Sequence, residues 1–390
     1  MTVIAPSQAA SDAEHVEALE VSVVIPCLNE AQSIEACVRS AFEAMARSKL
    51  AGEVVVADNG STDGSGELAL HAGARVVLVP DCGYGNAYRA GFGEARGTYI
   101  VMADADETYD FDDIPRFLHV LEDGADMVIG DRMRQIQPGA MSWHHRYLGN
   151  PALSGLLNLL FHTGVNDAHC GMRAFRRDRL ERLELRTSGM EFASEMVVRA
   201  AKEHLDVRQI PIRYHPRRGD SKLSSFKDGW RHVRYLLLHA PTHLFVLPGA
   251  ALALLGSLIS ATVLAHIGVL GRQWDLHTLI GGSLLLVTGA QLIGLGLCAH
   301  AYASYFMGER SRWFEWARHR WRLEHGLMAG CAVGLAGTTI LAAIIVDWLG
   351  SGLGDLSQER AAIVGGTLLT LGIQIAFTSF FLSILGLRRA

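Results

Sequence analysis

Hydrophobic and polar positions follow two different patterns along this chain of 390 residues. Up to about residue 240, short apolar runs alternate with polar loops and with stretches of helical periodicity. Strands that alternate with helices in this way are typical of a parallel, doubly wound α/β sheet. After Pro241, long uncharged runs dominate the sequence. The pattern therefore predicts a water-soluble α/β domain followed by a membrane domain.

Apolar runs with the pattern of buried strands recur through the first half of the chain. They cover residues 20–26, 53–58, 75–79, 98–103 and 126–130. In a parallel sheet, the loops that follow the strands meet at one edge, and open α/β sheets bind their ligands there. We therefore expect the polar residues of these loops to lie close together.

Runs long enough to cross a membrane as helices, which takes about 20 residues each, occur in the second half. They cover approximately residues 244–269, 276–306, 326–346 and 361–387, and none of them contains Lys, Arg, Asp or Glu. The segments outside them that are richest in positive charge carry Arg310, Arg312, Arg318, Arg320, Arg322, Arg388 and Arg389. By the positive-inside rule these segments face the cytoplasm, and an even number of spans places the N-terminal domain there too. We expect an integral protein of the cytoplasmic membrane.

These patterns suggest four parts. They are a disordered leader at 1–19, an α/β domain at 20–222, an amphipathic juxtamembrane helix at 223–241 and a four-helix transmembrane domain at 242–390. The leader lacks the basic segment and apolar core of a secretory signal. In the juxtamembrane helix, Phe226, Trp230, Val233 and Leu237 share one face. Such a helix tends to lie in the membrane interface, and packing against the soluble domain is the alternative.

Composition excludes several classes of protein. The net charge is −5, and no basic surface interleaved with aromatic residues indicates a nucleic-acid partner. The six cysteines show no CxxC spacing, so we interpret them as reduced thiols. The first strand is followed by 26-PCLNE-30 where a dinucleotide-binding protein has GxGxxG, and the chain contains no GxxxxGK[ST] loop. A dinucleotide oxidoreductase and an ATP-driven transporter are therefore disfavoured.

Asp104 and Asp106 directly follow the apolar run 98–103. Side chains alternate along an extended strand, so carboxylates at i and i+2 point to the same side. Paired carboxylates at a strand end suit a divalent cation that bridges to a diphosphate. The alternative is a solvated turn that precedes a helix. Acidic or amide residues also follow two earlier strands, at Asn29, Glu30, Asp58 and Asp63.

The ordered motifs 24-VIPCLNE-30, 58-DNGSTDG-64, 83-GYGNA-87, 104-DAD-106, 130-GDR-132 and 171-GMRAF-175 resemble those of family 2 GT-A glycosyltransferases. Within that family the chain is similar to dolichyl- and polyprenyl-phosphate sugar synthases. The resemblance covers about residues 20 to 225, and the four-helix tail is similar to that of multispanning members in topology only. It implies a GT-A catalytic domain, with a Rossmann-like and mostly parallel sheet, ahead of an all-α membrane domain.

The resemblance also implies a nucleotide site. Its members would be Pro26, Asn29, Glu30, Asp58, Asp63 and Asp104. Pro26, Glu30 and Asp58 would contact base and ribose, and Asp63 would support that pocket. Asp104 and Asp106 would hold the diphosphate through Mg²⁺ or Mn²⁺. Many mannose-type relatives carry Gln at the position of Thr108, so the segment 104-DADET-108 is more similar to the glucose-type relatives.

The second half of the site must bind an anionic lipid phosphate, and guanidinium groups match phosphate oxygens bidentately. The candidates for contact with acceptor phosphate or sugar are Arg132, Arg173, Glu191, Arg217 and Lys222. We favour Arg132, Arg217 and Lys222 as catalytic partners of Asp104 and Asp106. Arg132 follows a predicted strand, and the other two precede the membrane domain. Surface arginine and a solvent-facing Glu191 are the alternatives.

The expected reaction is inverting transfer of a hexose from a nucleotide sugar, with UDP-glucose favoured, to polyprenyl phosphate, in cell-envelope glycosylation. GDP-mannose and UDP-N-acetylhexosamine remain alternative donors. A processive polysaccharide synthase is disfavoured, because such enzymes carry Gln-x-x-Arg-Trp where this chain has only 317-ARHRW-321. The expected partners are the nucleotide sugar, the polyprenyl phosphate and membrane lipids, and a homo-oligomer is left open.

Overall fold

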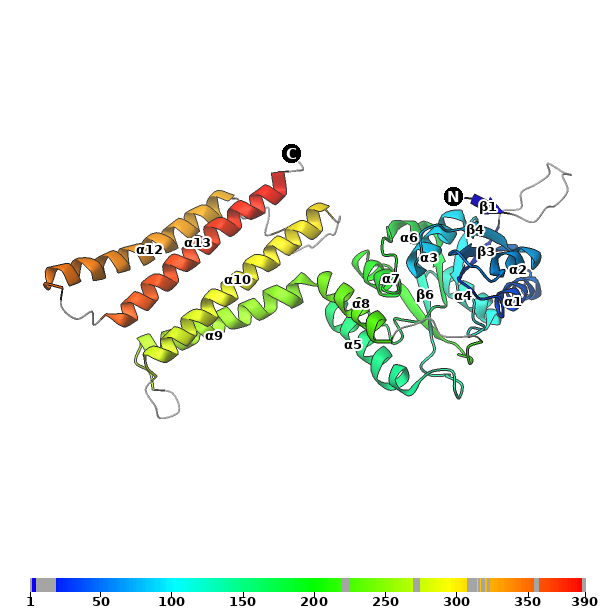
Figure 1. Cartoon of the computed structure of the whole chain (residues 1–390), viewed down its shortest axis with the longest axis horizontal. Helices are drawn as coiled ribbons and strands as arrows, with labels where there is room; N and C mark the ends of the chain where they lie inside the picture. Colours follow the sequence, from blue (N-terminus) through cyan, green and yellow to red (C-terminus); the bar gives the residue numbers. More distant parts are fainter. Residues whose placement is uncertain are drawn as a thin grey trace. The chain divides into compact units, whose positions relative to one another are not determined.

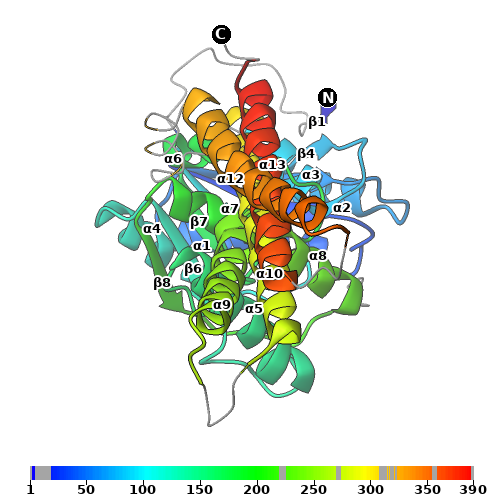
Figure 2. The ribbon, with the colours of Figure 1, turned by 90° about the vertical axis from the view of Figure 1, so that its left-hand side faces the viewer.

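The computed structural model describes residues 2–4, 19–218, 225–268, 274–306, 314, 316, 320, 323–353 and 358–387. It divides the chain into two compact units, Met1–Leu236 and Leu237–Ala390. After the roles expected from the sequence, we call them the catalytic unit and the membrane unit (Figures 1 and 2). Lys222, Arg388, Arg389 and all the arginines of 307–322 except Arg320 lie outside the described residues.

An eight-stranded sheet forms the centre of the catalytic unit, in the order β1-β4-β3-β2-β5-β7-β6-β8. The strands are β1 (Thr2–Ile4), β2 (Val21–Cys27), β3 (Gly52–Asp58), β4 (Arg75–Leu78), β5 (Tyr99–Met102), β6 (Met127–Asp131), β7 (Arg173–Arg176) and β8 (Val207–Pro211). Neighbouring strands are parallel except around β1 and β7, which run antiparallel to their neighbours. The mostly parallel α/β fold predicted from the sequence is confirmed.

Two strands differ from the prediction. Thr2–Ile4 lies in the leader that we expected to be disordered, yet it pairs with Val76–Leu78 at the edge of the sheet. β7 inserts antiparallel between β5 and β6. Its first residue therefore lies at the same sheet edge as the last residues of β5 and β6.

Helices connect the strands of the catalytic unit. They are α1 (Ile34–Arg47), α2 (Ser65–His71), α3 (Tyr84–Glu94), α4 (Ile114–Glu122), α5 (Asn150–Phe161), α6 (Arg177–Arg182), α7 (Phe192–Lys202) and α8 (Ser225–Leu238), with the shorter turns η1 (Phe111–Asp113) and η2 (His145–Gly149). In α1, the apolar residues Ile34, Val38 and Ala41 recur at helical spacing and are fully buried. This periodicity is what predicted the helix from the sequence.

α8 is the juxtamembrane helix. Its buried side carries His232, Tyr235 and Leu236, so this side packs inside the catalytic unit. Phe226 is 90% exposed and Trp230 is 59% exposed. One side of the predicted helix is therefore buried, and the aromatic residues Phe226 and Trp230 remain at the surface.

The membrane unit contains η3 (Thr242–Val246), α9 (Leu247–Leu264), α10 (Leu276–Phe306), α12 (Leu323–Gly350) and α13 (Glu359–Leu387). Among the described residues, four helical segments are long and apolar enough to cross a membrane, with mean hydropathy between 1.7 and 2.1. At most 28% of the most apolar stretch in any of them is buried within the unit. The four predicted spans are therefore confirmed as helices with apolar surfaces turned outward.

Glycines bring these helices together in antiparallel pairs. A side chain added at Gly256 would lie 2.5 Å from the carbonyl oxygen of Gly282, so α9 and α10 touch through their backbones. In the same way, a side chain added at Gly330 on α12 would lie 2.8 Å from the carbonyl oxygen of Gly372 on α13. Close backbone approach through small residues is the usual way in which membrane helices associate.

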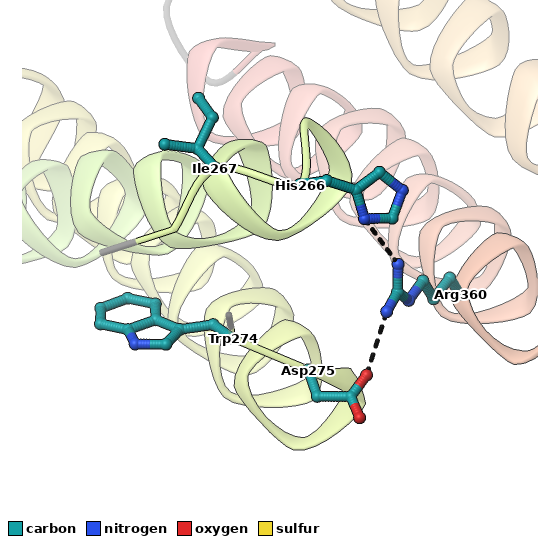
Figure 3. Close-up of a pocket in the computed structure, with 5 residues that line it drawn as sticks. All are labelled: His266, Ile267, Trp274, Asp275 and Arg360. Carbon is teal, nitrogen blue, oxygen red and sulfur yellow. Dashed lines mark hydrogen bonds and ion pairs between the residues drawn. The ribbon is translucent and has the colours of Figure 1, made fainter. Parts of the chain in front are cut away.

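A polar cluster joins α13 to the turn between α9 and α10 (Figure 3). Arg360 donates to Asp275 Oδ1 at 3.0 Å and lies 3.1 Å from His266 Nδ1. Together with Ile267 and Trp274 they line a small pocket of about 160 Å³. The cluster thus links two parts of the membrane unit that are far apart in sequence.

Candidate active site

Polar residues from several strands meet at one edge of the sheet. The carboxyl ends of β2, β3, β5 and β6 lie at this edge, and the amino end of β7 joins them because β7 is antiparallel. The edge therefore gathers the loops that bear Glu30, Asp58, Asp104, Arg132 and Arg173. This arrangement was expected for the loops that follow parallel strands.

The loops after β2 and β3 are linked by side chains. Asn29 donates its backbone N–H to Ser61 Oγ at 2.9 Å, and its Oδ1 accepts from Thr62 N at 2.7 Å. Asp63 Oδ2 accepts from Ala31 N at 3.0 Å. Asn29 and Asp63 thus hold the two loops together.

Asp58 and Glu30 also lie on these loops, and Asp58 is buried. Asp58 ends β3 and accepts from Ser61 N at 2.9 Å. The backbone of Glu30 donates to Ser65 Oγ at 2.8 Å, and its side chain pairs with Arg217. Pro26, the remaining residue of the predicted nucleotide site, lies half-buried near the end of β2.

Asp104 lies in a largely buried environment. Its Oδ1 accepts from Tyr84 OH at 3.0 Å and from Tyr88 OH at 3.3 Å. Gly171 approaches its Oδ2 so closely that a larger residue would collide with it. Burial, and next the charge of Asp106, raise the pKa of Asp104 to about 6. A bound cation would favour the ionised carboxylate, so this environment fits a metal ligand.

Asp106 divides its two oxygens between two partners. Its Oδ1 accepts from Thr108 Oγ1 at 2.5 Å and from Thr108 N at 3.2 Å. Its Oδ2 faces Arg217 at 3.5 Å. Thr108 therefore orients Asp106 in this structure. Among the described residues no group of three or more His, Cys, Asp or Glu side chains could hold a metal. Two carboxylates remain, and Mg²⁺ is commonly held by one or two carboxylates plus the phosphates of a substrate.

Arg132 follows β6 as predicted, but its guanidinium is committed to a protein partner. Nε and one terminal nitrogen donate to Asp167 at 2.7 and 2.9 Å, and both residues are buried. The other terminal nitrogen reaches Tyr109 OH at 3.4 Å, and the guanidinium lies 5.0 Å from the ring centre of Tyr214. Its charge lowers the pKa of Asp104 after the larger effects of burial and of Asp106.

Arg173 differs from our expectation of a phosphate ligand. Its exposed fraction is 0%, and it donates to the backbone oxygens of Cys170, Ala193 and Ala168 at 2.8 to 2.9 Å. In this structure the guanidinium cannot reach a ligand in solvent. It supports the loop 168–170 and α7 instead, through these hydrogen bonds to backbone oxygens.

Glu191 directly precedes α7 and lies half-buried. Its Oε2 is buried without a hydrogen-bond partner among the described residues. Nearby, Ser188 O accepts from Gly85 N at 2.9 Å, so this loop packs against the start of α3, which carries Tyr84. The carboxylate of Glu195, by contrast, accepts hydrogen bonds from the backbone N–H groups of Arg186 and Thr187.

Histidines near the site are mostly structural in their contacts. His169 Nε2 lies 3.2 Å from Ser194 Oγ, which lies 2.8 Å from His232 Nδ1. Burial lowers the pKa of both histidines, that of His232 to about 4. His144 directly precedes η2 and His145 begins it, and their ring centres lie 6.0 Å apart.

Arg217 reaches the acidic loops directly. It donates to Glu30 Oε1 at 2.8 Å and lies 3.5 Å from Asp106 Oδ2. The structure thus brings Glu30, Asp106 and Arg217 together. Lys222, the other basic residue predicted in this segment, lies outside the described residues.

Sequence reasoning missed several supporting residues. Tyr84 and Tyr88 orient Asp104, Thr108 orients Asp106, and Asp167 holds Arg132. A signal existed for the tyrosines, because spacing of i and i+4 places both on one face of the helix that follows Gly83. No comparable local signal marked Asp167 as the partner of Arg132, which lies 35 positions away.

Comparison with known proteins identifies the family of this chain. Residues 22–184 match the family Glycosyl transferase family 2, and residues 297–386 match the C-terminal transmembrane region of family 2 glycosyltransferases. The low-salt glycan biosynthesis hexosyltransferase Agl6 of Haloferax volcanii is 41% identical over 94% of this chain and 89% of its own length. The chain therefore belongs to glycosyltransferase family 2 and is a glycosyltransferase with a C-terminal transmembrane region.

Other relatives carry more specific names. The dolichyl-phosphate hexose transferase of Haloferax volcanii is 36% identical over 45% of this chain and 76% of its own length. The undecaprenyl-phosphate 4-deoxy-4-formamido-L-arabinose transferase of Salmonella choleraesuis is 29% identical over 75% of this chain and 91% of its own. A solved structure of glucosyl-3-phosphoglycerate synthase from Mycobacterium tuberculosis with Mn²⁺ and UDP-glucose is similar at a TM-score of 0.47, with 21% identity over 57% of this chain and 80% of that one.

Proposed function

We propose that this glycosyltransferase moves a hexose from a nucleoside-diphosphate sugar to a polyprenyl phosphate, with inversion at the anomeric carbon. The observation that carries the proposal is that Arg217 faces Glu30 and Asp106 at the sheet edge that also bears Asp58 and Asp104, in a chain that continues into four helices long enough to span a membrane. The names of the dolichyl- and undecaprenyl-phosphate relatives support the same acceptor class.

The donor would bind across the loops after β2 and β3. In this proposal Pro26, Asn29, Glu30 and Asp58 surround base and ribose, while Asp63 supports the loops through its bond to Ala31. UDP-glucose is the favoured donor because Thr108 stands where mannose-type relatives commonly carry Gln. GDP-mannose and UDP-N-acetylhexosamine are the alternatives.

Asp104 and Asp106 would hold a Mg²⁺ or Mn²⁺ ion, which would neutralise charge on the leaving diphosphate. The protein contributes pre-positioned ligands, since Tyr84 and Thr108 already orient the two carboxylates. Arg132 is buried and held by Asp167. Its positive charge acts on Asp104 and lowers the pKa of that carboxyl. Preorganised charges of this kind lower a barrier because they need no rearrangement during the reaction.

Bond formation is a single displacement. An oxygen of the acceptor phosphate forms the new bond to the anomeric carbon while the bond from that carbon to the nucleoside diphosphate breaks. A phosphate monoester is largely ionised near pH 7, so no strong general base is required. Arg217 and Lys222 would position the acceptor phosphate, and Glu191 would use its unpartnered Oε2 to hold a sugar hydroxyl.

The acceptor must present its phosphate at the membrane surface. The exposed aromatic residues Phe226 and Trp230 of α8 and Trp143 near η2 suit an interface between headgroups and acyl chains. We propose that the catalytic unit faces the cytoplasm, where nucleotide sugars are made. In a protein freed of its native cysteines, Ser351→Cys should react with an impermeant maleimide applied to intact cells, and Arg320→Cys should not. The reverse pattern would overturn this orientation.

The direct test is transfer by the purified full-length protein. A panel of radiolabelled UDP- and GDP-sugars is supplied with Mn²⁺ and a short polyprenyl phosphate, and label is measured in the extracted lipid. We expect one sugar per lipid from one preferred donor. Absence of lipid-linked label with every donor would refute the acceptor, and products with many sugars would indicate a polysaccharide synthase.

A further inference from the structure

Arg217 occupies an unusual position between the two halves of the site. Its guanidinium reaches Glu30 on the loop after β2 and Asp106 on the loop after β5. The loop after β5 is also joined to the segment of Arg217 through the backbone, since Arg218 N donates to Asp106 O at 3.2 Å and His215 N donates to Thr108 O at 3.0 Å. These backbone hydrogen bonds place the segment of Arg217 beside the acidic residues.

The contacts of Arg217 are incomplete when compared with those of a structural arginine. Arg75 uses Nε and both terminal nitrogens on Glu53 and Glu94, at 2.8 to 3.2 Å. Among the described residues, Arg217 makes a short contact only to Glu30, and its distance to Asp106 is 3.5 Å. Its Nε is buried and has no partner among these residues. A guanidinium held this loosely can exchange partners at little cost.

The oxygen that faces Arg217 is also the one left for a metal. Thr108 occupies Asp106 Oδ1, whereas Oδ2 has Arg217 as its neighbour. A guanidinium and a divalent cation both seek this carboxylate, and the positive charge of one disfavours the other. Without donor, the Arg217 charge balances two carboxylates that would otherwise repel each other.

We infer that Arg217 is a resident counter-ion that competes with the divalent metal for Asp106 and is released toward the acceptor phosphate when metal and nucleotide bind. This rests on the proposed function and adds an order to it: donor and metal bind first, and acceptor binds second. Arg217 then acts as a positioning residue in the free site and as a phosphate ligand only in the loaded one.

The first test measures Mn²⁺ binding to the full-length protein in detergent, without nucleotide, by the EPR signal of free Mn²⁺. Arg217→Gln should tighten Mn²⁺ binding by about fivefold, because a competing cation is removed. Arg217→Lys, which keeps one charge but cannot bridge two carboxylates, should give a smaller gain and serves if the Gln variant fails to fold. The matched control is Arg218→Gln, since Arg218 pairs with Glu107 and is more exposed.

An unchanged or weaker Mn²⁺ affinity in both Arg217 variants would overturn the inference. So would an equal gain in Arg218→Gln, which would show a general charge effect. If Mn²⁺ binds neither the wild type nor the variants, even with UDP, the metal role in the proposed function fails as well. Normal Mn²⁺ binding with no effect of Arg217 leaves the proposed function intact and refutes only the competition.

The second test measures the coupling to acceptor. Affinity for a short-chain prenyl phosphate is determined by calorimetry with and without Mn²⁺ and UDP. In the wild type, Mn²⁺ and UDP should tighten this binding by about fivefold, because Arg217 has been released. In Arg217→Gln the increase should disappear. An equal increase in both proteins, or none in the wild type, would refute the ordered release.

Discussion

Polar side chains bond in opposite ways in the two units. In the catalytic unit they connect segments far apart in sequence, as Asn29 does with Thr62 and Tyr84 with Asp104. In the membrane unit, hydroxyls mostly return to their own helix, as in Thr338 to Gly334 O at 2.9 Å and Ser379 to Ile375 O at 2.7 Å. The reason is that hydroxyls in a bilayer find no water to satisfy them.

The difference teaches where each unit is sensitive to change. In the catalytic unit, geometry depends on hydrogen bonds and charges between loops, so loss of a polar group should matter most. In the membrane unit, geometry depends on backbones that touch at glycines, so addition of a methyl group should matter most. The four predictions below test that contrast in order of expected effect.

The largest effect is expected for Asp106→Asn. A neutral amide of nearly equal volume replaces a proposed metal ligand, so transfer should fall by about a thousandfold while the protein still folds and inserts. Initial rates of sugar transfer to lipid measure this. Asp110→Asn is the control in the same loop, because Asn can still cap η1. Turnover near the wild-type rate, or full activity in excess EDTA, would contradict the metal role.

The second prediction concerns the buried His169–Ser194–His232 chain. Burial lowers the pKa of His232 from 6.5 to about 4, aided by the nearby charge of Arg173 and opposed by Asp228. The unfolded chain therefore takes up a proton at a higher pH than the folded one does. Stability is fully present above pH 6.5 and should decline as pH falls toward 4, by about 3 kcal/mol from this group.

Denaturant unfolding of the detergent-solubilised protein at a series of pH values measures the decline. His232→Gln keeps a hydrogen-bonding group near Ser194 but cannot titrate, so its stability should depend less on pH in this range. His169 contributes in the same direction and is unchanged in the variant. A pH profile identical to that of the wild type would show that His232 is already protonated or exposed.

The sequence predicted those parts of the fold and site that are local. Apolar runs marked β2, β3 and β5, and the spacing of Asp104 and Asp106 placed both carboxylates at one strand end. The sequence did not reveal β7, since its four residues include two arginines that look solvent-exposed. It also could not show that Arg173 is buried, because its partners are backbone oxygens that carry no sequence signal.

The site itself was predicted by residue type more fully than by role. Glu30, Asp106 and Arg217 were all named as site residues. Their contact could not be predicted, since Glu30 and Arg217 lie 187 residues apart in the sequence. Hydrophobic periodicity cannot encode such a pairing, whereas the fold produces it by carrying the segment after β8 across the sheet edge. Arg132 likewise was expected to face a phosphate, and its pairing with Asp167 emerged only from the structure.

The third prediction adds one methyl group to the seam between α9 and α10. A side chain at Gly289 would lie 2.5 Å from the carbonyl oxygen of Gly249 and would also meet the backbone of Ala253. Gly289→Ala should therefore cost about 2 kcal/mol of stability. The matched control is Gly281→Ala on the same helix, where nothing lies within 4 Å. Equal thermal stability of the two variants in detergent would show that the helices do not touch at Gly289.

The smallest effect is expected for the polar cluster of Arg360, Asp275 and His266, which resembles the catalytic unit in linking distant segments. Side-chain exposure is 39% for Arg360 and 78% for Asp275, so water already satisfies much of their charge. Arg360→Ala should cost less than about 1 kcal/mol, and salt should reduce that cost further. A double-mutant cycle with Asp275→Ala isolates the pair from other effects of each truncation. If the coupling exceeds the loss caused by Gly289→Ala, polar links rather than backbone contacts determine the stability of the membrane unit, and the contrast between the two units does not hold.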